Sequence, residues 1–371
     1  MTDSDMKYKI GISLIPGIGS ILAKKLIAYT GSVEGVFKEK KQNLLKIPGI
    51  GEVLANEIVH QDILERAEHE LAFIEKYHIT TLFYLDKKYP ERLKCCEDAP
   101  VILFMKGDID LNHPKILSIV GTRNATQNGK EYCEKLVADL AKHDQQVIVI
   151  SGLAYGIDIC AHKAALSSGL PTVAVLGHGL KTIYPAVHKS VAQEICKTGA
   201  LVTDFFSDEP INRNNFISRN RIIAGLADAT IVVESGEKGG ALITADIANS
   251  YNRDVFAFPG RVNDKYSAGC NQLIKNNKAI LIEGAQDLEY VLGWAVADSK
   301  KVIQKELFVS LSDSERHILD LLNSNGELTG DAIALLANMP VSKISPLLLN
   351  LEFSGIIKNL PGNIYKLSIN V

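Results

Sequence analysis

Runs of apolar residues alternate with longer stretches of helical periodicity through the middle of the chain. Each run is short, continuous and rich in Val, Ile and Leu, which is typical of a strand buried on both faces of a sheet. Helices between successive strands favour parallel pairing, because a parallel connection must cross the sheet. The pattern predicts an α/β fold, an extended Rossmann-like doubly wound parallel sheet, with strands at 116–120, 147–151, 172–176, 200–203, 230–234, 254–258 and 279–282.

An internal repeat precedes this region, because the segment 14–23 recurs as 46–55. Both copies contain Ile-Pro-Gly-Ile-Gly, a tight turn that opens into a helix. Two such units predict a helix-hairpin-helix (SAM-like) domain over 1–78. The N–H groups at each helix start can hold a phosphate oxygen, and Lys24 and Lys25 favour the first copy for that role. The alternative is that both turns only pack a helical bundle.

The chain ends in a compact helical tail. After a polar stretch it has three helical segments and then a turn at Pro361-Gly362-Asn363 that is typical of a two-stranded wing. This order predicts a winged helix. Its expected recognition helix has Lys343 as its one cation, which favours protein contact over reading of the major groove. The predicted domains are 1–78, 79–297 with an extended lead-in, a linker at 298–309, and 310–371.

Composition adds limits rather than a function. The chain has 371 residues, 46% hydrophobic and 22% charged, with a net charge of -3, so any affinity for nucleic acid must come from local patches. No apolar run is long enough to span a bilayer and no leader precedes the first helix, which predicts a soluble, cytoplasmic protein without membrane contact. The six cysteines contain no C-x-x-C pair, which predicts reduced thiols and no metal site.

Candidate chemistry lies in the loops that follow the predicted strands, because ligands of open parallel sheets bind beyond the carboxyl ends of the strands. Glycines in these loops let backbone N–H groups approach a phosphate, and an arginine adds a bidentate charge-assisted bond. The loops are 121–124, 151–158, 177–185, 213–221 and 234–244.

The loop 213–221 has three arginines, three asparagines and Phe216, with no acid among them. Clustered arginine favours an anionic partner, and the phenylalanine offers a face for base stacking. The alternative is that these arginines pair with carboxylates such as Asp204 or Glu234. Arg123, beside Gly121 at a strand end, is the other residue expected to bind phosphate.

Standard catalytic and nucleotide motifs are absent from the sequence. Gly121 and Gly129-Lys130 are too far apart for a Walker loop, and Gly177-x-Gly179 lacks the third glycine of the dinucleotide fingerprint. The histidines lack zinc-site spacing, and no G-x-S-x-G elbow occurs. We therefore expect no catalytic residue, no metal and no cofactor.

Taken together, the loops resemble the DNA-processing protein A (DprA/Smf) family over nearly the whole chain. The family motif G-S-R appears as Gly121-Thr122-Arg123, and R-N-R-I-I-A-G-L appears as 219–226. The motifs S-G-x-A-x-G-I-D, G-x-G-L-x-x-x-Y-P, G-x-L-I-T-A and V-F-A-x-P-G stand at 151–158, 177–185, 240–245 and 255–260. Departures are Tyr155 for a common arginine, Ile217-Ser218 for a Pro-Arg step, and His188 for an asparagine.

The resemblance implies binding of single-stranded DNA in a basic pocket at the sheet edge, without enzymatic activity. It also implies a homodimer through the Rossmann domain and loading of the RecA recombinase onto DNA in natural transformation and recombination. The DNA-binding residues expected from the loops and the resemblance together are Gly121, Thr122, Arg123, Asn124, Ser151, Gly152, Lys181, Lys189, Phe216, Arg219, Asn220, Arg221, Gly239 and Gly240.

An enzymatic alternative is a nucleoside monophosphate phosphoribohydrolase of the lysine-decarboxylase-like Rossmann group. That group uses a P-G-G-x-G-T-x-x-E loop, to which the segment 234–244 is distantly similar. Here the proline is absent and Asp246 and Ile247 stand where the glutamate is needed. A third possibility is a scaffold that recruits partners without touching DNA.

Overall fold

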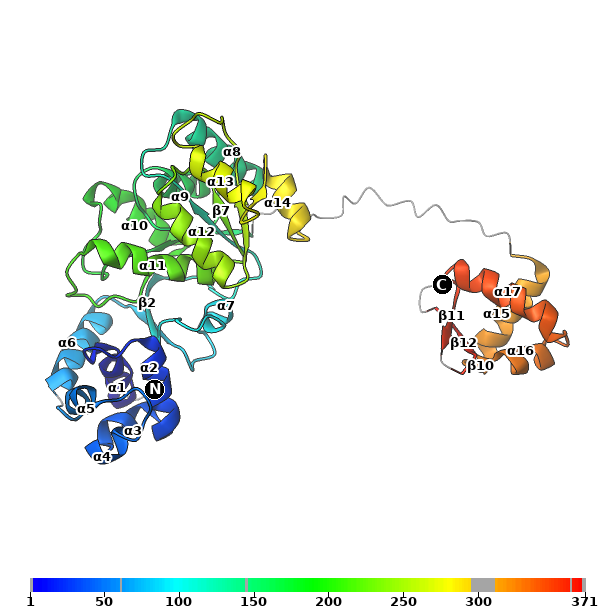
Figure 1. Cartoon of the computed structure of the whole chain (residues 1–371), viewed down its shortest axis with the longest axis horizontal. Coiled ribbons are helices and arrows are strands. Elements are labelled where there is room, and N and C mark those ends of the chain that lie inside the picture. The colour runs from blue at the N-terminus through cyan, green and yellow to red at the C-terminus, as the bar shows by residue number, and fades with distance from the viewer. Residues whose placement is uncertain (1–2, 61, 144–145, 295–310, 361, 369–371) are drawn as a thin grey trace. The chain divides into compact units, whose positions relative to one another are not determined.

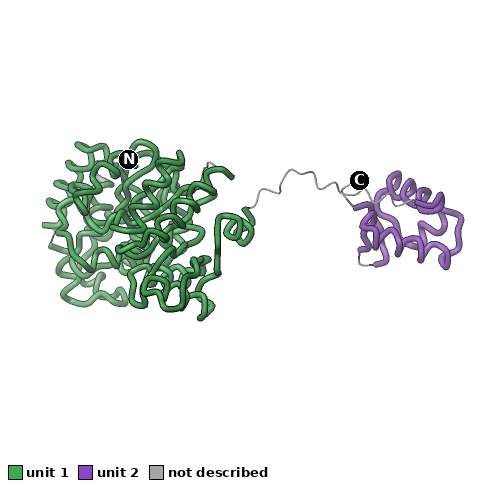
Figure 2. The backbone as a smooth tube through the Cα atoms, turned by 90° about the horizontal axis from the view of Figure 1, so that it is seen from above, with its two compact units in different colours: residues 1–295 green, residues 296–371 purple. Residues whose placement is uncertain are grey.

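The computed structural model describes residues 3–60, 62–143, 146–294, 311–360 and 362–368. The chain divides into two compact units, 1–295 and 296–371, coloured separately in Figure 2. The predicted linker at 298–309 lies outside the described residues. Each unit is described by itself below.

The first unit contains a nine-stranded sheet in the order β1-β2-β6-β5-β4-β3-β7-β8-β9. Neighbouring strands from β6 through to β9 pair in parallel, while β1 pairs with β2 and β2 with β6 in antiparallel fashion. The predicted α/β fold is therefore confirmed. The extended segment before β3 supplies the two antiparallel strands at the edge, β1 and β2. The strands are β1 (Thr80–Phe83), β2 (Ile102–Gly107), β3 (Ile116–Val120), β4 (Ile148–Ser151), β5 (Thr172–Val175), β6 (Ala200–Thr203), β7 (Ala229–Val232), β8 (Asp254–Ala257) and β9 (Ile280–Leu281).

Helices cover both faces of this sheet, which is why the central strands are buried and mostly apolar (Figure 1). One hydrophobic cluster joins the sheet to α11, α12 and α13, and another joins it to α8, α9 and α14. The helices of this region are α7 (Glu91–Lys94), α8 (Gln127–His143), α9 (Ile157–Ser167), the short 3-10 turn η1 (Ala186–His188), α10 (Lys189–Thr198), α11 (Arg213–Leu226), α12 (Gly240–Ser250), α13 (Ala268–Lys275) and α14 (Ala285–Val291).

The two N-terminal hairpins pack against each other reciprocally. A Cβ placed on Gly17 would lie 3.0 Å from Leu54 Cδ2, and one on Gly49 would lie 3.2 Å from Leu22 Cδ2. Leu22 and Leu54 occupy the same position in the two copies, and both glycines have positive φ. The repeat therefore closes a helical bundle made of α1 (Asp3–Leu14), α2 (Ser20–Thr30), α3 (Val33–Lys38), α4 (Lys41–Leu44), α5 (Glu52–Val59) and α6 (Asp62–Lys76).

This bundle shares a core with the antiparallel edge of the sheet, because one apolar cluster includes residues of α1 to α6 together with Phe104 of β2 and Phe206. Lys24 of the first hairpin helix donates to the carbonyl of Glu97 at 3.1 Å, and burial lowers its pKa. The first copy thus faces the sheet region, which favours the packing alternative for it over phosphate binding.

The second unit is a winged helix, as predicted. Its helices are α15 (Asp313–Asn325), α16 (Gly330–Leu336) and α17 (Val341–Phe353), and its sheet has the order β10-β12-β11, with β10 (Leu328–Thr329), β11 (Ile357–Leu360) and β12 (Ile364–Leu367). Among the described residues, no helix alone is long and apolar enough to cross a membrane. The pair α16 and α17, bent by 115°, reaches that length and composition only when taken together.

Candidate nucleic-acid interface

The carboxyl ends of β3, β4 and β5 lie side by side in the sheet, and the strand order reverses next to them, between β3 and β7. Open α/β sheets bind ligands at such a reversal point, where the loops on either side diverge. The loops after these strands contain most of the residues singled out in the sequence. Their side chains, however, divide into a buried set and an exposed set.

Glu234, in the loop after β7, occupies the start of α8. Its Oε2 accepts a hydrogen bond from the N–H of Thr126 at 2.9 Å, and its backbone carbonyl accepts one from Thr122 at 2.7 Å. A Cβ on Gly129 would lie 2.2 Å from this carboxylate, so the first turn of α8 closes tightly over it. The helix start that would hold the pyrophosphate of a dinucleotide therefore already has an acid of the protein itself.

Arg219 is buried, with 3% of its surface exposed. Its Nη1 donates to the carbonyl of Gly152 at 2.7 Å and to that of Val175. Burial lowers the pKa of the guanidinium to about 10, while the nearby Asp158 raises it. The expectation that Arg219 contacts phosphate directly does not fit this placement, because its side chain instead joins the ends of β4 and β5 from within.

Arg221 is also engaged by the protein. Its guanidinium forms an ion pair with Asp204 and a hydrogen bond to the carbonyl of Asp98. Burial raises the pKa of Asp204, and Arg221 opposes that rise. The pairing of Arg221 with Asp204, the alternative weighed for this arginine, is therefore observed, while its contact with DNA stays a prediction.

Arg123 is exposed, and its guanidinium lies 6.0 Å from the centre of the Phe216 ring. Phe216 is half-buried because it packs over Gly177, where a Cβ would lie 2.8 Å from the ring atom Cδ1. Lys181 and Lys189 are exposed in the segment that follows β5, and Asn124 is exposed beside Arg123. This exposed set combines cations with an aromatic face, as single-strand binders do.

The small residues of the expected site form its supports. The Ser151 hydroxyl donates to the carbonyl of Ile119 at 2.6 Å, and Gly152 leaves room for the Arg219 guanidinium. Gly121 lies between Ile157 and the carbonyl of Glu234, where a Cβ would overlap both. The Thr122 hydroxyl accepts from the N–H of Asn124 at 3.2 Å, and Asn220 is half-buried on α11.

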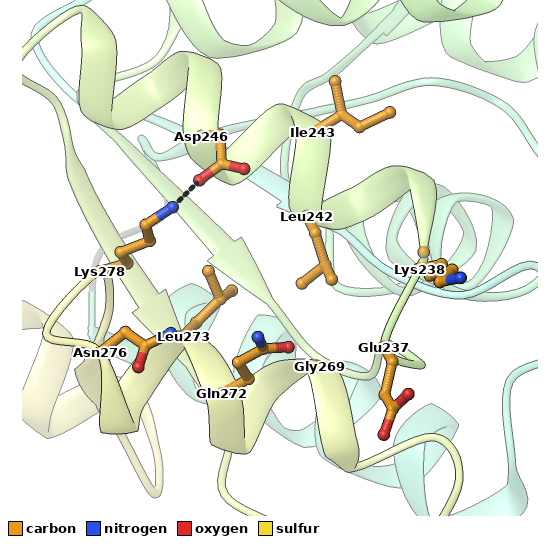
Figure 3. A pocket seen from close by; sticks show the side chains of 11 residues that line it. Glu237, Lys238, Leu242, Ile243, Asp246, Gly269, Gln272, Leu273, Asn276 and Lys278 are labelled. Carbon is orange, nitrogen blue, oxygen red and sulfur yellow. Dashed lines mark hydrogen bonds and ion pairs between the residues drawn. The ribbon is translucent and has the colours of Figure 1, made fainter.

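Gly239 and Gly240 belong to a different loop, after β7. Gly239 lines a pocket of about 400 Å³ between α12 and α13, and Gly240 is exposed at the first position of α12. Figure 3 shows Leu242 and Leu273 pointing into this pocket and the ion pair between Asp246 and Lys278 at 2.8 Å. The lining of the pocket mixes apolar side chains with charged and amide ones, and the contact of Gly239 and Gly240 with DNA stays a prediction.

Two exposed tyrosines were not among the expected binding residues. Tyr155 and Tyr184 are each 47% exposed, in the loops after β4 and β5. The sequence signal was available, since both are aromatic residues in strand-following loops. Neither tyrosine belongs to the pattern of arginine and glycine, which marks phosphate ligands.

Comparison with known proteins agrees with this architecture, an open Rossmann-like sheet followed by a winged helix. The family model described as DNA recombination-mediator protein A matches residues 80–292, and the DprA winged helix domain matches residues 309–363. The chain therefore belongs to the DNA recombination-mediator protein A (DprA/Smf) family.

Relatives match over most of the chain. The DNA processing protein DprA of Streptococcus pneumoniae is 36% identical over 68% of this chain and 95% of its own length. The protein Smf of Escherichia coli is 34% identical over 82% of this chain and 84% of its own. The X-ray structure of the pneumococcal protein aligns with TM-score 0.68 at 32% identity, over 76% of this chain and 97% of that one.

A second solved structure concerns the single-stranded DNA binding mode of DNA processing protein A from Helicobacter pylori. It aligns with TM-score 0.52 at 29% identity, over 58% of this chain and 96% of that one.

Replacing Arg219 tests its role as an internal support. We expect Arg219→Ala to lower the free energy of unfolding by about 3 kcal/mol or more, because two carbonyls lose their donor and Asp158 loses its cation. Urea unfolding measures this change. The exposed Arg123→Ala is the matched control, expected to change stability by less than about 0.5 kcal/mol. Equal stability of the two variants would contradict the assignment.

Proposed function

We propose that this protein binds single-stranded DNA at Arg123 and the half-buried Phe216, together with the exposed Lys181 and Lys189 and with Thr122 and Asn124 at the border. The observation that carries the proposal is the Arg123 guanidinium beside the Phe216 ring, on the loop edge where β3 and β5 end. The guanidinium can hold a phosphate through two parallel hydrogen bonds while the ring stacks against a base. The relative from Helicobacter pylori, described by its single-stranded DNA binding mode, supports the same ligand.

The role we infer is binding without chemistry on the strand, as part of DNA processing in transformation and recombination. Among the described residues, no three His, Cys, Asp or Glu side chains are grouped to hold a metal ion. The hydrolase alternative is not favoured, because Asp246, near the position where that group needs its glutamate, is paired with Lys278. Glu234 is likewise occupied, at the start of α8.

Removing Arg123 tests the proposed phosphate contact. We expect Arg123→Ala to weaken binding of an oligo-dT strand about tenfold, and to reduce the slope of log K against log salt by about 0.7, the value of one phosphate on a single strand. Fluorescence anisotropy across a salt series measures both. Lys135→Ala, an exposed cation on α8, is the control and should leave both unchanged. Unaltered affinity of Arg123→Ala would contradict the site.

We also propose that two copies associate through α12 and α13. Ile243 is 40% exposed on α12 and lines the pocket drawn in Figure 3 together with Leu242 and Leu273, and grouped apolar residues at a surface favour protein contact. We expect Ile243→Arg to halve the mass in sedimentation velocity. Val53→Arg, at another exposed apolar position, should leave the mass unchanged. A dimer that persists in Ile243→Arg would exclude this surface.

The bound strand would then pass to the RecA recombinase. This step rests on membership of a family described as recombination mediators. We expect the protein to shorten the lag of RecA ATP hydrolysis on strands covered by single-strand-binding protein, and Arg123→Ala to lose that effect. If the wild-type protein binds the strand tightly yet leaves the lag unchanged, recombinase loading is excluded while strand binding stands.

A further inference from the structure

Two exposed aromatic rings border the proposed site and have no part in the function proposed above. Tyr155 follows β4 and Tyr184 follows β5, and each keeps 47% of its surface exposed. Large amphipathic rings exposed near cations are typical of binding surfaces, because they supply contact area at a small cost in side-chain entropy. Their placement beside Arg123 and Phe216 therefore calls for a physical explanation.

Tyr155 is fixed to both neighbouring loops. Its ring packs edge-on against the ring of His188, with centroids 5.1 Å apart. His188 is itself buried, and its Nδ1 bonds to the carbonyl of Leu153 at 2.8 Å. The next residue, Gly156, lies so close to the Arg123 loop that a Cβ there would be 2.1 Å from the carbonyl of Thr122. Tyr155 thus stands on a rigid support between the Arg123 loop and the loop after β5.

Tyr184 is held on the other side of the same surface. Its ring lies 5.6 Å from that of Phe216, tilted by 42°, and its N–H donates to His178 Nε2 at 3.2 Å. His178 is buried, so this part of the loop is anchored as well. Arg123 contacts Phe216, and Phe216 contacts Tyr184. The segment that contains Tyr184 continues to His188, whose ring contacts that of Tyr155. Gly156, next to Tyr155, packs against the loop that contains Arg123. Tyr155, Tyr184, Phe216 and Arg123 are therefore linked by one series of contacts across neighbouring loops.

We propose that Tyr155 and Tyr184 are additional base-stacking positions, so that the site holds several successive unpaired bases. This inference rests on the proposed function and specifies which part of the strand the site recognises, namely the unpaired bases. A paired base has both faces covered by its neighbours, whereas an unpaired base can leave the strand's own stack and lie on a ring. Every base has a flat face, so recognition of this kind distinguishes single from double strands with little regard to sequence. Tyr155 adds contact area without charge, so we expect this contact to depend little on salt.

The test compares oligo-dT with an abasic strand of equal length, which keeps the phosphates and lacks the bases. We expect Tyr155→Ala and Tyr184→Ala each to weaken binding of oligo-dT about fivefold or more, while the abasic strand binds as it does to the wild type. The salt slope should not change, because no phosphate contact is lost. Tyr155→Phe should bind like the wild type, since the ring and not the hydroxyl does the stacking.

The outcomes separate this inference from the function on which it rests. If the alanine variants lose affinity equally for oligo-dT and the abasic strand, the rings only shape the loops and the inference is wrong. If both variants bind oligo-dT as well as the wild type does, the inference fails while strand binding stands. If the wild-type protein binds neither strand at low salt, the proposed function itself fails.

Discussion

The guanidinium of Arg219 is the interaction on which the exposed surface depends. It lies beneath the loops, where it bonds to the carbonyls at the ends of β4 and β5 and faces the buried Asp158. The carboxyl ends of parallel strands leave carbonyls without strand partners, and a buried carbonyl without a donor is costly. The Nη1 group of Arg219 supplies the missing donor to a carbonyl at the end of each of the two strands. The loops after β3 and β4 can then present Arg123 and Tyr155 to solvent, next to Phe216 of α11.

Most of the fold followed from periodicity alone. The strands at 116–120 and 200–203 begin and end where the apolar runs predict, although each also contains one buried polar residue, Ser118 or Thr203. The winged helix followed from three helical segments and a Pro-Gly-Asn turn. The shared core of the N-terminal helices and the sheet edge could not be predicted, since Phe104 and Phe206 are far along the chain from the helices they contact.

The roles of the arginines were harder to predict because charge alone does not tell an exposed cation from a buried one. Arg219 lies on the stripe of α11 that includes Ile222, Ile223 and Leu226, all buried. Spacing of three, four and seven residues places it on the apolar face of the helix, so helical periodicity could have assigned it to the interior. The partner of Arg221 could be guessed only as one carboxylate among several. Tyr155 and Tyr184 lie outside the arginine and glycine pattern because that pattern marks phosphate ligands, whereas unpaired bases are also held by stacking.

The carboxylate of Glu234 has a consequence for how the protein responds to its surroundings. In a Rossmann-like sheet that holds a dinucleotide, the start of the first helix is open to whatever pyrophosphate the cell supplies. Here that start is closed permanently by a tethered acid, whose effective concentration no diffusing nucleotide can match. A fold widely used to bind metabolic cofactors is thereby disconnected from their supply at this position.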